Sequence, residues 1–374
     1  MNLFVFAVFI IWRVWLFFVA AVGEKILAFT PRFPYSDVYF IPSHLPSWLW
    51  GFANFDGVHY LTIAKFGYSA QFTQVFFPLY PMMVGFINQL LQKVNPVIIG
   101  LLISNLLFFL SLLILTKLLS LDYKVDTIKW ILLFLIFFPT SFFFGSLYTE
   151  SLFLFLILTA FYAARKNQWL AASIFGVLAS STKFIGIFLL PALLWEWQEQ
   201  KRKKITTIFR SPLSLIPVGL LSYMLYLQVK FGDWLYFWHA QPVFGAQRSG
   251  GGVILIPQVL WRYMKILTSV SYKTEAFWIP LLELISTLGV ITLLIMAFKK
   301  KIRSSYLVFS FLTIITPTFT GTFSSMPRYI LVAFPIFIVL GMLKSRLIKG
   351  IFLAIFSVLL LVLTILFTRG HWVS

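Results

Sequence analysis

Long apolar runs dominate the chain, and short polar or basic stretches separate them. A helix that crosses a membrane needs about 20 apolar residues, or fewer where protein surrounds it. On that rule the pattern predicts spans near residues 3–22, 97–119, 130–145, 150–165, 213–230, 277–298, 305–320, 328–343 and 350–367. The stretch 168–198 is too long for one ordinary span and carries Lys183 at its middle, so we interpret it as two short helices that meet near Lys183. We therefore expect about eleven spans.

Two segments between the predicted spans are long, at roughly 23–96 and 231–276. Both are rich in Trp, Tyr and Phe, which suits structure at a membrane interface, and connections of this length are usually functional or form surface helices. The first run, Leu3 to Val22, has no basic stretch before it, which favours an uncleaved span over a signal peptide. The prediction is one all-α transmembrane domain over residues 1–374 with helical outer loops.

Composition excludes several classes of protein. Apolar residues make up 60% of the 374 and charged residues 11%, against roughly 25% charged residues in soluble domains. That balance excludes a soluble enzyme, a disordered chain and a fibrous repeat. The chain has no cysteine, so disulfides, thiolate metal sites and cysteine nucleophiles are excluded as well.

The net charge of +19 predicts the orientation of the spans, because Lys and Arg collect in cytoplasmic loops. With the N-terminus inside, the inner loops hold 17 of the 30 basic residues and four of the 11 acidic ones, a net charge of +13 (17 minus 4). Most of the excess therefore reflects topology and not a nucleic-acid partner. We expect a multi-pass protein of the cell membrane (the endoplasmic reticulum membrane in a eukaryote), with a cytoplasmic N-terminus and an extracytoplasmic C-terminus.

Candidate chemistry lies in the first outer loop, in the run from Asn54 to Tyr60. If a helix starts at Asn54, then Asp56, His59 and Tyr60 share one helix face, and a carboxylate beside an imidazole can accept a proton. The alternative is structural: Asn54 caps the helix and Asp56 in its first turn favours the helix dipole.

Two further motifs stand near predicted outer helix ends. Phe76 to Pro81 contains Tyr80 between two prolines and is read as the start of a helix. Tyr148-Thr149-Glu150 opens a span, where a glutamate is costly and often functional. The structural alternative is that Thr149 caps this helix and Glu150 lies in its first turn.

Three cations at outer helix ends or loops could converge on a phosphate: Lys183, Arg328 and Arg248. The alternative for them is anchoring at the membrane interface by snorkelling. Arg13 and Glu283 lie inside predicted spans and could pair with each other or with neighbours. The sequence has no Asp-x-Asp pair, no His cluster and no phosphate-cradling loop, so we expect no metal and no nucleotide cofactor.

Six motifs in order resemble one family. They are FDGVHY at 55–60, IAKFGY at 63–68, FFPLYP at 76–81, GSLYTES at 145–151, STKFIG at 181–186 and SMPRYILVAFP at 325–335. In content and order they resemble the GPI mannosyltransferase 2 (PIG-V/Gpi18-like) family, which has the GT-C architecture of many membrane helices and a catalytic carboxylate in the first outer loop. Some GT-C relatives carry two carboxylates, whereas only Asp56 stands here, which leaves a second acidic partner open.

The resemblance implies a glycosyltransferase that takes mannose, or another hexose, from polyprenyl or dolichyl phosphate mannose and inverts its anomeric configuration. It implies that Asp56 is the general base and that Lys183, Arg328 and Arg248 hold the donor phosphate. The resemblance also implies six residues that line the sugar and acceptor pocket or orient Asp56: His59, Tyr60, Tyr80, Tyr148, Glu150 and His239.

The short chain, compact loops and Ile-, Lys- and Phe-rich composition point to a prokaryotic member. The acceptor is then a glycan, glycolipid or protein and not a GPI precursor. The main alternative function is a transporter or flippase of lipid-linked sugars, which should show repeated halves and broken helices at matching positions. A non-catalytic scaffold subunit is the other alternative.

Overall fold

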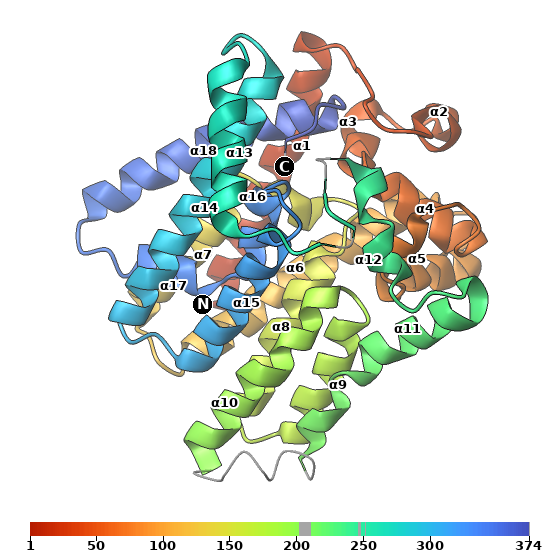
Figure 1. Cartoon of the computed structure of the whole chain (residues 1–374). Coiled ribbons are helices and arrows are strands. Elements are labelled where there is room, and N and C mark those ends of the chain that lie inside the picture. The colour runs from red at the N-terminus through yellow and green to blue at the C-terminus, as the bar shows by residue number, and fades with distance from the viewer. Residues whose placement is uncertain (202–210, 246–247, 251, 374) are drawn as a thin grey trace. The chain divides into compact units, whose positions relative to one another are not determined.

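The computed structural model describes residues 1–201, 211–245, 248–250 and 252–373, and within those ranges the chain forms helices and no strand (Figure 1). The predicted all-α class is therefore confirmed for the described residues. The α-helices are α1 (Asn2–Ile26), α2 (Ser36–Tyr39), α3 (Ser47–Trp50), α4 (Asp56–Phe66), α5 (Leu79–Leu90), α6 (Pro96–Leu119), α7 (Val125–Ile136), α8 (Glu150–Arg165), α9 (Trp169–Ser180), α10 (Leu189–Lys201), α11 (Val218–Phe231), α12 (Tyr236–His239), α13 (Ile256–Ser269), α14 (Glu275–Lys299), α15 (Ser304–Thr318), α16 (Met326–Tyr329), α17 (Pro335–Gly341) and α18 (Arg346–Thr368).

Five helical segments of the described chain are long and apolar enough to cross a membrane. They are α1, α6, the continuous stretch Pro212–Phe231 that contains α11, α14 and α18. Only 22% of the most apolar window of α18 is buried in the protein, as expected for a helix that faces lipid. The chain is thus a membrane protein by these helices, whereas the total of about eleven spans and their orientation stay predictions.

The stretch 168–198 contains two helices, as predicted. Helix α9 ends at Ser180, Lys183 is extended (φ −151°, ψ 146°), and the 3₁₀ helix Phe184–Phe188 leads into α10. The chain packs so closely at this break that a Cβ on Gly186 would lie 2.3 Å from the carbonyl oxygen of Ala179. Only glycine leaves room for that approach.

Two predicted spans are not continuous helices. Helix α7 ends at Ile136, and residues 137–149 run through turns and a short 3₁₀ helix instead of extending a span to residue 145. Residues 328–343 likewise divide between α16, a 3₁₀ turn and α17. Pro139 and Pro335 explain both breaks, because proline disfavours the helical conformation in the residue before it. The apolar residues of 139–149 are buried all the same, so the apolar pattern reports burial here and not a helix.

The chain divides into two compact units. The first contains Met1–Ala70, Pro78–Lys166 and Leu340–Val373, and the second contains Gln71–Phe77 and Asn167–Val339. In the first unit α8 packs along α6 and α1 packs along α18 (Figure 1). The rings of Phe108 and Phe144 stack at 4.4 Å between centroids in its core. In the second unit α10 packs on α15 and α13 on α14.

The two charged residues inside predicted spans have different surroundings. Arg13 is buried in the first unit, where its guanidinium lies 3.9 Å from the ring centre of Phe17 and 4.6 Å from that of Phe52. Glu283 is buried in the second unit and accepts a hydrogen bond from Tyr263. Each has neighbours within its own unit, as one of the sequence interpretations expected.

Candidate functional site

The backbone before Asp56 has an unusual conformation. Phe55 has φ 59° and ψ −112°, and α4 begins at the next residue. A bulky residue rarely adopts a positive φ unless its surroundings hold it there. The ring of Phe55 lies against those of Phe33, Phe367 and Trp372 at 4.8, 5.7 and 5.1 Å, and these contacts fix the turn that places Asp56.

Tyr148 ties this turn to the start of α8. Its hydroxyl donates to the carbonyl oxygen of Asn54 at 2.9 Å and accepts the backbone N–H of Asp56 at 3.2 Å. Asn54 does not cap α4 with its side chain, so that part of the structural alternative is wrong, whereas Asp56 does lie in the first turn of the helix. Its amide donates to the carbonyls of Phe367 and Thr368 at the end of α18 instead. The start of α4 is therefore held by groups from two distant parts of the sequence.

Asp56, His59 and Tyr60 lie at the predicted spacing within α4, although the helix starts two residues later than supposed. The Asp56 and His59 side chains are half-buried, while most of their neighbours are fully buried. Burial lowers the pKa of His59, and the nearby Asp56 charge opposes that shift. The imidazole is therefore neutral near pH 7 and can donate and accept one hydrogen bond each.

Glu150 opens α8 next to this turn and is 1% exposed. Thr149 stands at the cap position, but its hydroxyl lies 3.4 Å from that of Tyr60 and makes no capping bond. Tyr80 donates to the carbonyl of Gly100 at 3.0 Å, and its ring meets that of Tyr60 at 5.4 Å. Burial raises the pKa of Tyr80, and the Glu150 charge adds to that shift.

The first unit therefore brings together six residues that the sequence selected: Asp56, His59, Tyr60, Tyr80, Tyr148 and Glu150. They come from the N-terminal turns of α4, α5 and α8 and from the loop before α8. Asp56 and Glu150 each lie in the first turn of a helix, a position that acidic side chains favour because of the helix macrodipole. The arrangement offers a half-buried carboxylate, Asp56, beside the half-buried imidazole of His59, and the three buried tyrosines hold the start of α4 against its neighbours.

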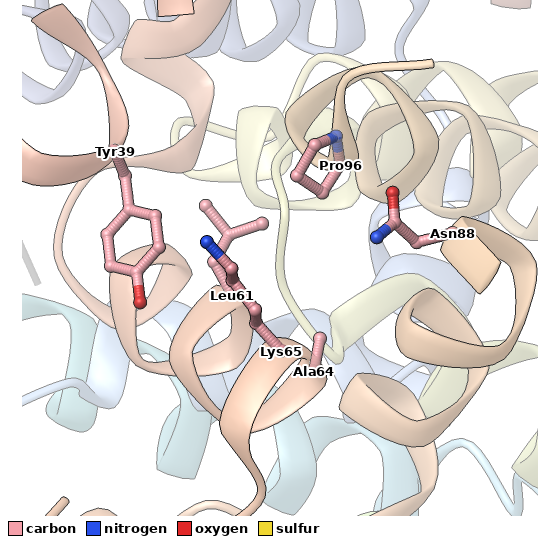
Figure 2. A pocket seen from close by; sticks show the side chains of 6 residues that line it. All are labelled: Tyr39, Leu61, Ala64, Lys65, Asn88 and Pro96. Atoms are coloured by element: carbon pink, nitrogen blue, oxygen red, sulfur yellow. The ribbon is translucent and has the colours of Figure 1, made fainter. Parts of the chain in front are cut away.

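A small cavity of about 80 Å³ opens beside another part of α4. Figure 2 shows Leu61, Ala64 and Lys65 of this helix in the cavity wall, together with three residues from neighbouring elements: Tyr39, Asn88 and Pro96. Its lining contains one ammonium group and no carboxylate. The cavity is thus separate from the carboxylate cluster and lacks a group that could act as a base.

Arg248 lies in the second unit between two side chains. Its guanidinium donates to Gln241 at 3.0 Å and to the hydroxyl of Ser325 at 3.4 Å. Ser325 is the residue before α16, the short helix that carries Arg328. Two of the three predicted phosphate-binding cations therefore belong to loops that are in contact with each other.

The other two candidates of this unit, Lys183 and His239, lie on segments that contact each other, because the ring of Phe184 lies 5.8 Å from that of Phe237 in α12. Lys183 is half-buried at the break between α9 and the 3₁₀ helix that follows. The His239 imidazole is 49% exposed, and its Nδ1 lies 2.7 Å from a carboxylate oxygen of Asp233. Among the residues that the structure describes, no three His, Asp or Glu side chains group together as a metal site would need.

Comparison with known families decides what kind of protein this is. Residues 3–203, somewhat more than half of the chain, match the family described as mannosyltransferase (PIG-V). The chain belongs to the PIG-V mannosyltransferase family. The comparison with curated proteins found no match.

Family membership supports a membrane glycosyltransferase and does not favour a transporter or flippase. The matched residues include the whole Asp56 cluster and Lys183. Arg248, Arg328 and His239 lie beyond residue 203, so their roles depend on this chain's own geometry.

From the sequence alone, no role was assigned to several residues of these sites. Gln241 and Ser325 hold Arg248, and Tyr263 joins Glu283 to the loop before α16. The Ser324-Ser325 pair directly before Met326 was the available signal, because hydroxyl side chains favour turns and helix starts. Tyr263 had no signal of its own, since one tyrosine on an amphipathic helix resembles any other.

Proposed function

We propose that this PIG-V family protein transfers a mannose from a polyprenyl or dolichyl phosphate donor to a hydroxyl group of an acceptor, on the extracytoplasmic side of the membrane. The observation that carries the proposal is the half-buried Asp56 at the start of α4, whose backbone is held by Tyr148 and whose charge acts on the nearby His59. A positioned carboxylate of this kind suits a general base.

In the proposed reaction the acceptor hydroxyl attacks the anomeric carbon of the sugar from the side opposite the phosphate. Asp56 takes the proton of that hydroxyl as the new carbon–oxygen bond forms. The bond between the anomeric carbon and the phosphate oxygen breaks, and the lipid phosphate leaves with the electron pair. The product has the inverted configuration, and the proton on Asp56 returns to solvent.

The leaving phosphate needs positive charge, because negative charge builds on its oxygen as the bond breaks. Arg248 suits this role, since Gln241 and Ser325 hold its planar guanidinium in one orientation. We assign Arg328 and Lys183 to the same phosphate. Because three side chains can supply the charge, the proposal requires no metal ion.

The remaining candidates would recognise the sugar and the acceptor or hold Asp56 in place. We assign Glu150 as the second acidic group, which lies buried near enough to Tyr80 for its charge to act on that hydroxyl and helps to orient the residues around Asp56. The half-buried His59 supplies a donor and an acceptor to the bound sugar or acceptor, while the buried Tyr60 and Tyr148 hold α4 in place. The acceptor is proposed to be a glycan, glycolipid or glycoprotein of a prokaryotic cell surface.

The test is transfer of radiolabelled mannose from polyprenyl phosphate mannose by purified protein in lipid nanodiscs, with a panel of acceptors. Asp56→Asn keeps the shape of the side chain and removes the base, so we expect the rate to fall by about 10²- to 10⁴-fold. Asp37→Asn is the matched control, because Asp37 is an exposed aspartate in the same outer segment. Wild-type rates in Asp56→Asn would contradict the assignment of the base.

A further inference from the structure

The loop that carries Arg248 is bonded to the segment that leads into α16. The backbone N–H of Ser249 donates to the carbonyl of Thr320 at 2.8 Å, and that of Ile254 donates to the carbonyl of Phe319 at 3.0 Å. Gly321 has φ +89°, and a Cβ there would lie 2.5 Å from Cδ1 of Ile254. The positive φ therefore favours glycine at this turn, and any side chain there would also displace the end of the Ile254 side chain.

Helix α13 holds the same turn from another direction. Arg262 donates to the carbonyl of Gly321 at 3.0 Å. The hydroxyl of Tyr263 accepts the backbone N–H of Phe323 at 3.0 Å and lies 3.0 Å from the hydroxyl of Thr322. Tyr263 is buried, so these contacts are shielded from water and persist.

Glu283 of α14 completes the arrangement. Its carboxylate is 4% exposed and accepts the Tyr263 hydroxyl at 2.5 Å, the Ser324 side chain and the Ser325 backbone N–H. The charge of this carboxylate also acts on Arg248. An ionisable residue within an apolar membrane helix is expensive, and such residues are usually kept for function.

These bonds meet at Ser325, which has φ 66° and ψ 8°. A serine adopts this left-handed conformation only where its neighbours hold it. Ser325 bonds Arg248 through its hydroxyl and starts the helix that carries Arg328. Ser325 therefore links the Arg248 side chain to the start of the helix that carries Arg328.

We propose that Glu283 and Tyr263 are positioning residues, which fix the loop Gly321–Arg328 so that Arg248 and Arg328 together bind the phosphate of the lipid-linked donor. The inference rests on the proposed function, because that function supplies the phosphate. Neither positioning residue touches the donor; each acts through the loop.

The experiment measures equilibrium binding of radiolabelled polyprenyl phosphate, the leaving product, together with the KM values for donor and acceptor and kcat. Tyr263→Phe removes the hydroxyl that bridges Glu283 and the loop. We expect the Kd for polyprenyl phosphate and the donor KM to rise about tenfold, the size of one lost hydrogen bond to a charged group, and kcat to fall because the same arginines stabilise the leaving phosphate, whereas the acceptor KM stays nearly unchanged. Glu283→Ala should act in the same direction.

Glu283→Gln provides rescue, because its carboxamide oxygen still accepts hydrogen bonds although the charge is gone. We expect its Kd to stay within about threefold of wild type, whereas a purely electrostatic role would make it as weak as Glu283→Ala. Tyr272→Phe and Glu275→Gln are matched controls near the same helices, and Tyr272 is 64% exposed. Ser324→Ala, which removes a single donor to Glu283, is a milder variant in case Tyr263→Phe folds poorly.

The outcomes separate the two proposals. A folded Tyr263→Phe protein that transfers mannose with wild-type donor KM and wild-type Kd would overturn the positioning roles alone. Wild-type protein that binds polyprenyl phosphate with the expected dependence on Tyr263, but transfers no mannose to any acceptor, would overturn the proposed reaction and support the positioning roles.

Discussion

Phe55 illustrates how single residues prepare the candidate base. Its positive φ stores strain that costs about 1–3 kcal/mol, and aromatic contacts and the Tyr148 hydrogen bonds hold it in place. Strained backbone of this kind concentrates at functional sites, where it orients a side chain before substrate binds. The strain directly before Asp56 therefore agrees with the catalytic role proposed for that residue.

His59 makes a prediction about pH at the same scale. Because burial lowers the pKa of this imidazole, the unfolded chain takes up its proton at a higher pH than the folded protein does. Stability from this residue is thus present above about pH 6.5 and decreases as the pH falls through the ordinary histidine range. We expect His59→Gln to lose less thermal stability than wild type between pH 7.5 and 5.5, measured by melting in detergent.

The control for His59 is His44→Asn. His44 is exposed and has φ 54°, a conformation that asparagine tolerates well. This variant should keep the wild-type dependence of melting temperature on pH. Identical pH dependence in His59→Gln and wild type would show that the burial of His59 has no consequence for stability.

Among the helices, the junction of α10 and α15 gives a structural role to Glu196 and Arg303. In the sequence, charges of this kind counted only as signals of topology. Glu196 is fully buried and accepts the Arg303 guanidinium at 2.6 and 2.5 Å and the Ser305 hydroxyl at 2.7 Å. Arg303 and Ser305 lie at the start of α15, so one carboxylate joins the two helices. If the buried Glu196 lost these partners, its charge would stay in an apolar environment without compensation, which is costly.

Arg303→Met should therefore destabilise the second unit, because it leaves the Glu196 charge buried without its cation. Loss of one partner of a buried pair costs about 3–5 kcal/mol, and the partial exposure of Arg303 places the expectation at about 3. Lys300→Met removes an exposed charge from the same connection and should change stability little. Thermal melting of both variants in one detergent measures the difference, and equal melting temperatures would exclude a stabilising role for the pair.

How much of the candidate site could be predicted depends on the kind of signal. Asp56, His59 and Tyr60 share a helix at a fixed spacing, so their common face followed from local periodicity. Tyr148 and Thr149 belong to a motif that the sequence analysis selected, but their hydrogen bonds to α4 span about 90 residues of sequence. No local pattern encodes such a contact, because it depends on how helices pack. The same holds for Tyr263, Glu283 and Ser325.

For the molecule as a whole, the predicted orientation can be tested directly because the chain has no native cysteine. Ser69→Cys probes the first predicted outer segment and Lys300→Cys a predicted inner loop, and both positions are exposed. A membrane-impermeant maleimide applied to intact cells should label Ser69→Cys, and should label Lys300→Cys only after permeabilisation. The reverse pattern would place Asp56 on the cytoplasmic side and contradict the proposed extracytoplasmic reaction.

The sequence by itself determined the class of this protein: apolar runs longer than a soluble core needs, basic connections and six ordered motifs indicated a helical membrane protein of the mannosyltransferase family. These properties depend on local sequence or on overall composition, so they can be predicted without knowing how the helices pack. Only the tertiary structure decided where apolar runs stop being helices, how Tyr148 fixes Asp56, and why Glu283 is buried. The physical reason is that a buried polar group must find its partner in three dimensions, and that partner is usually remote in the chain.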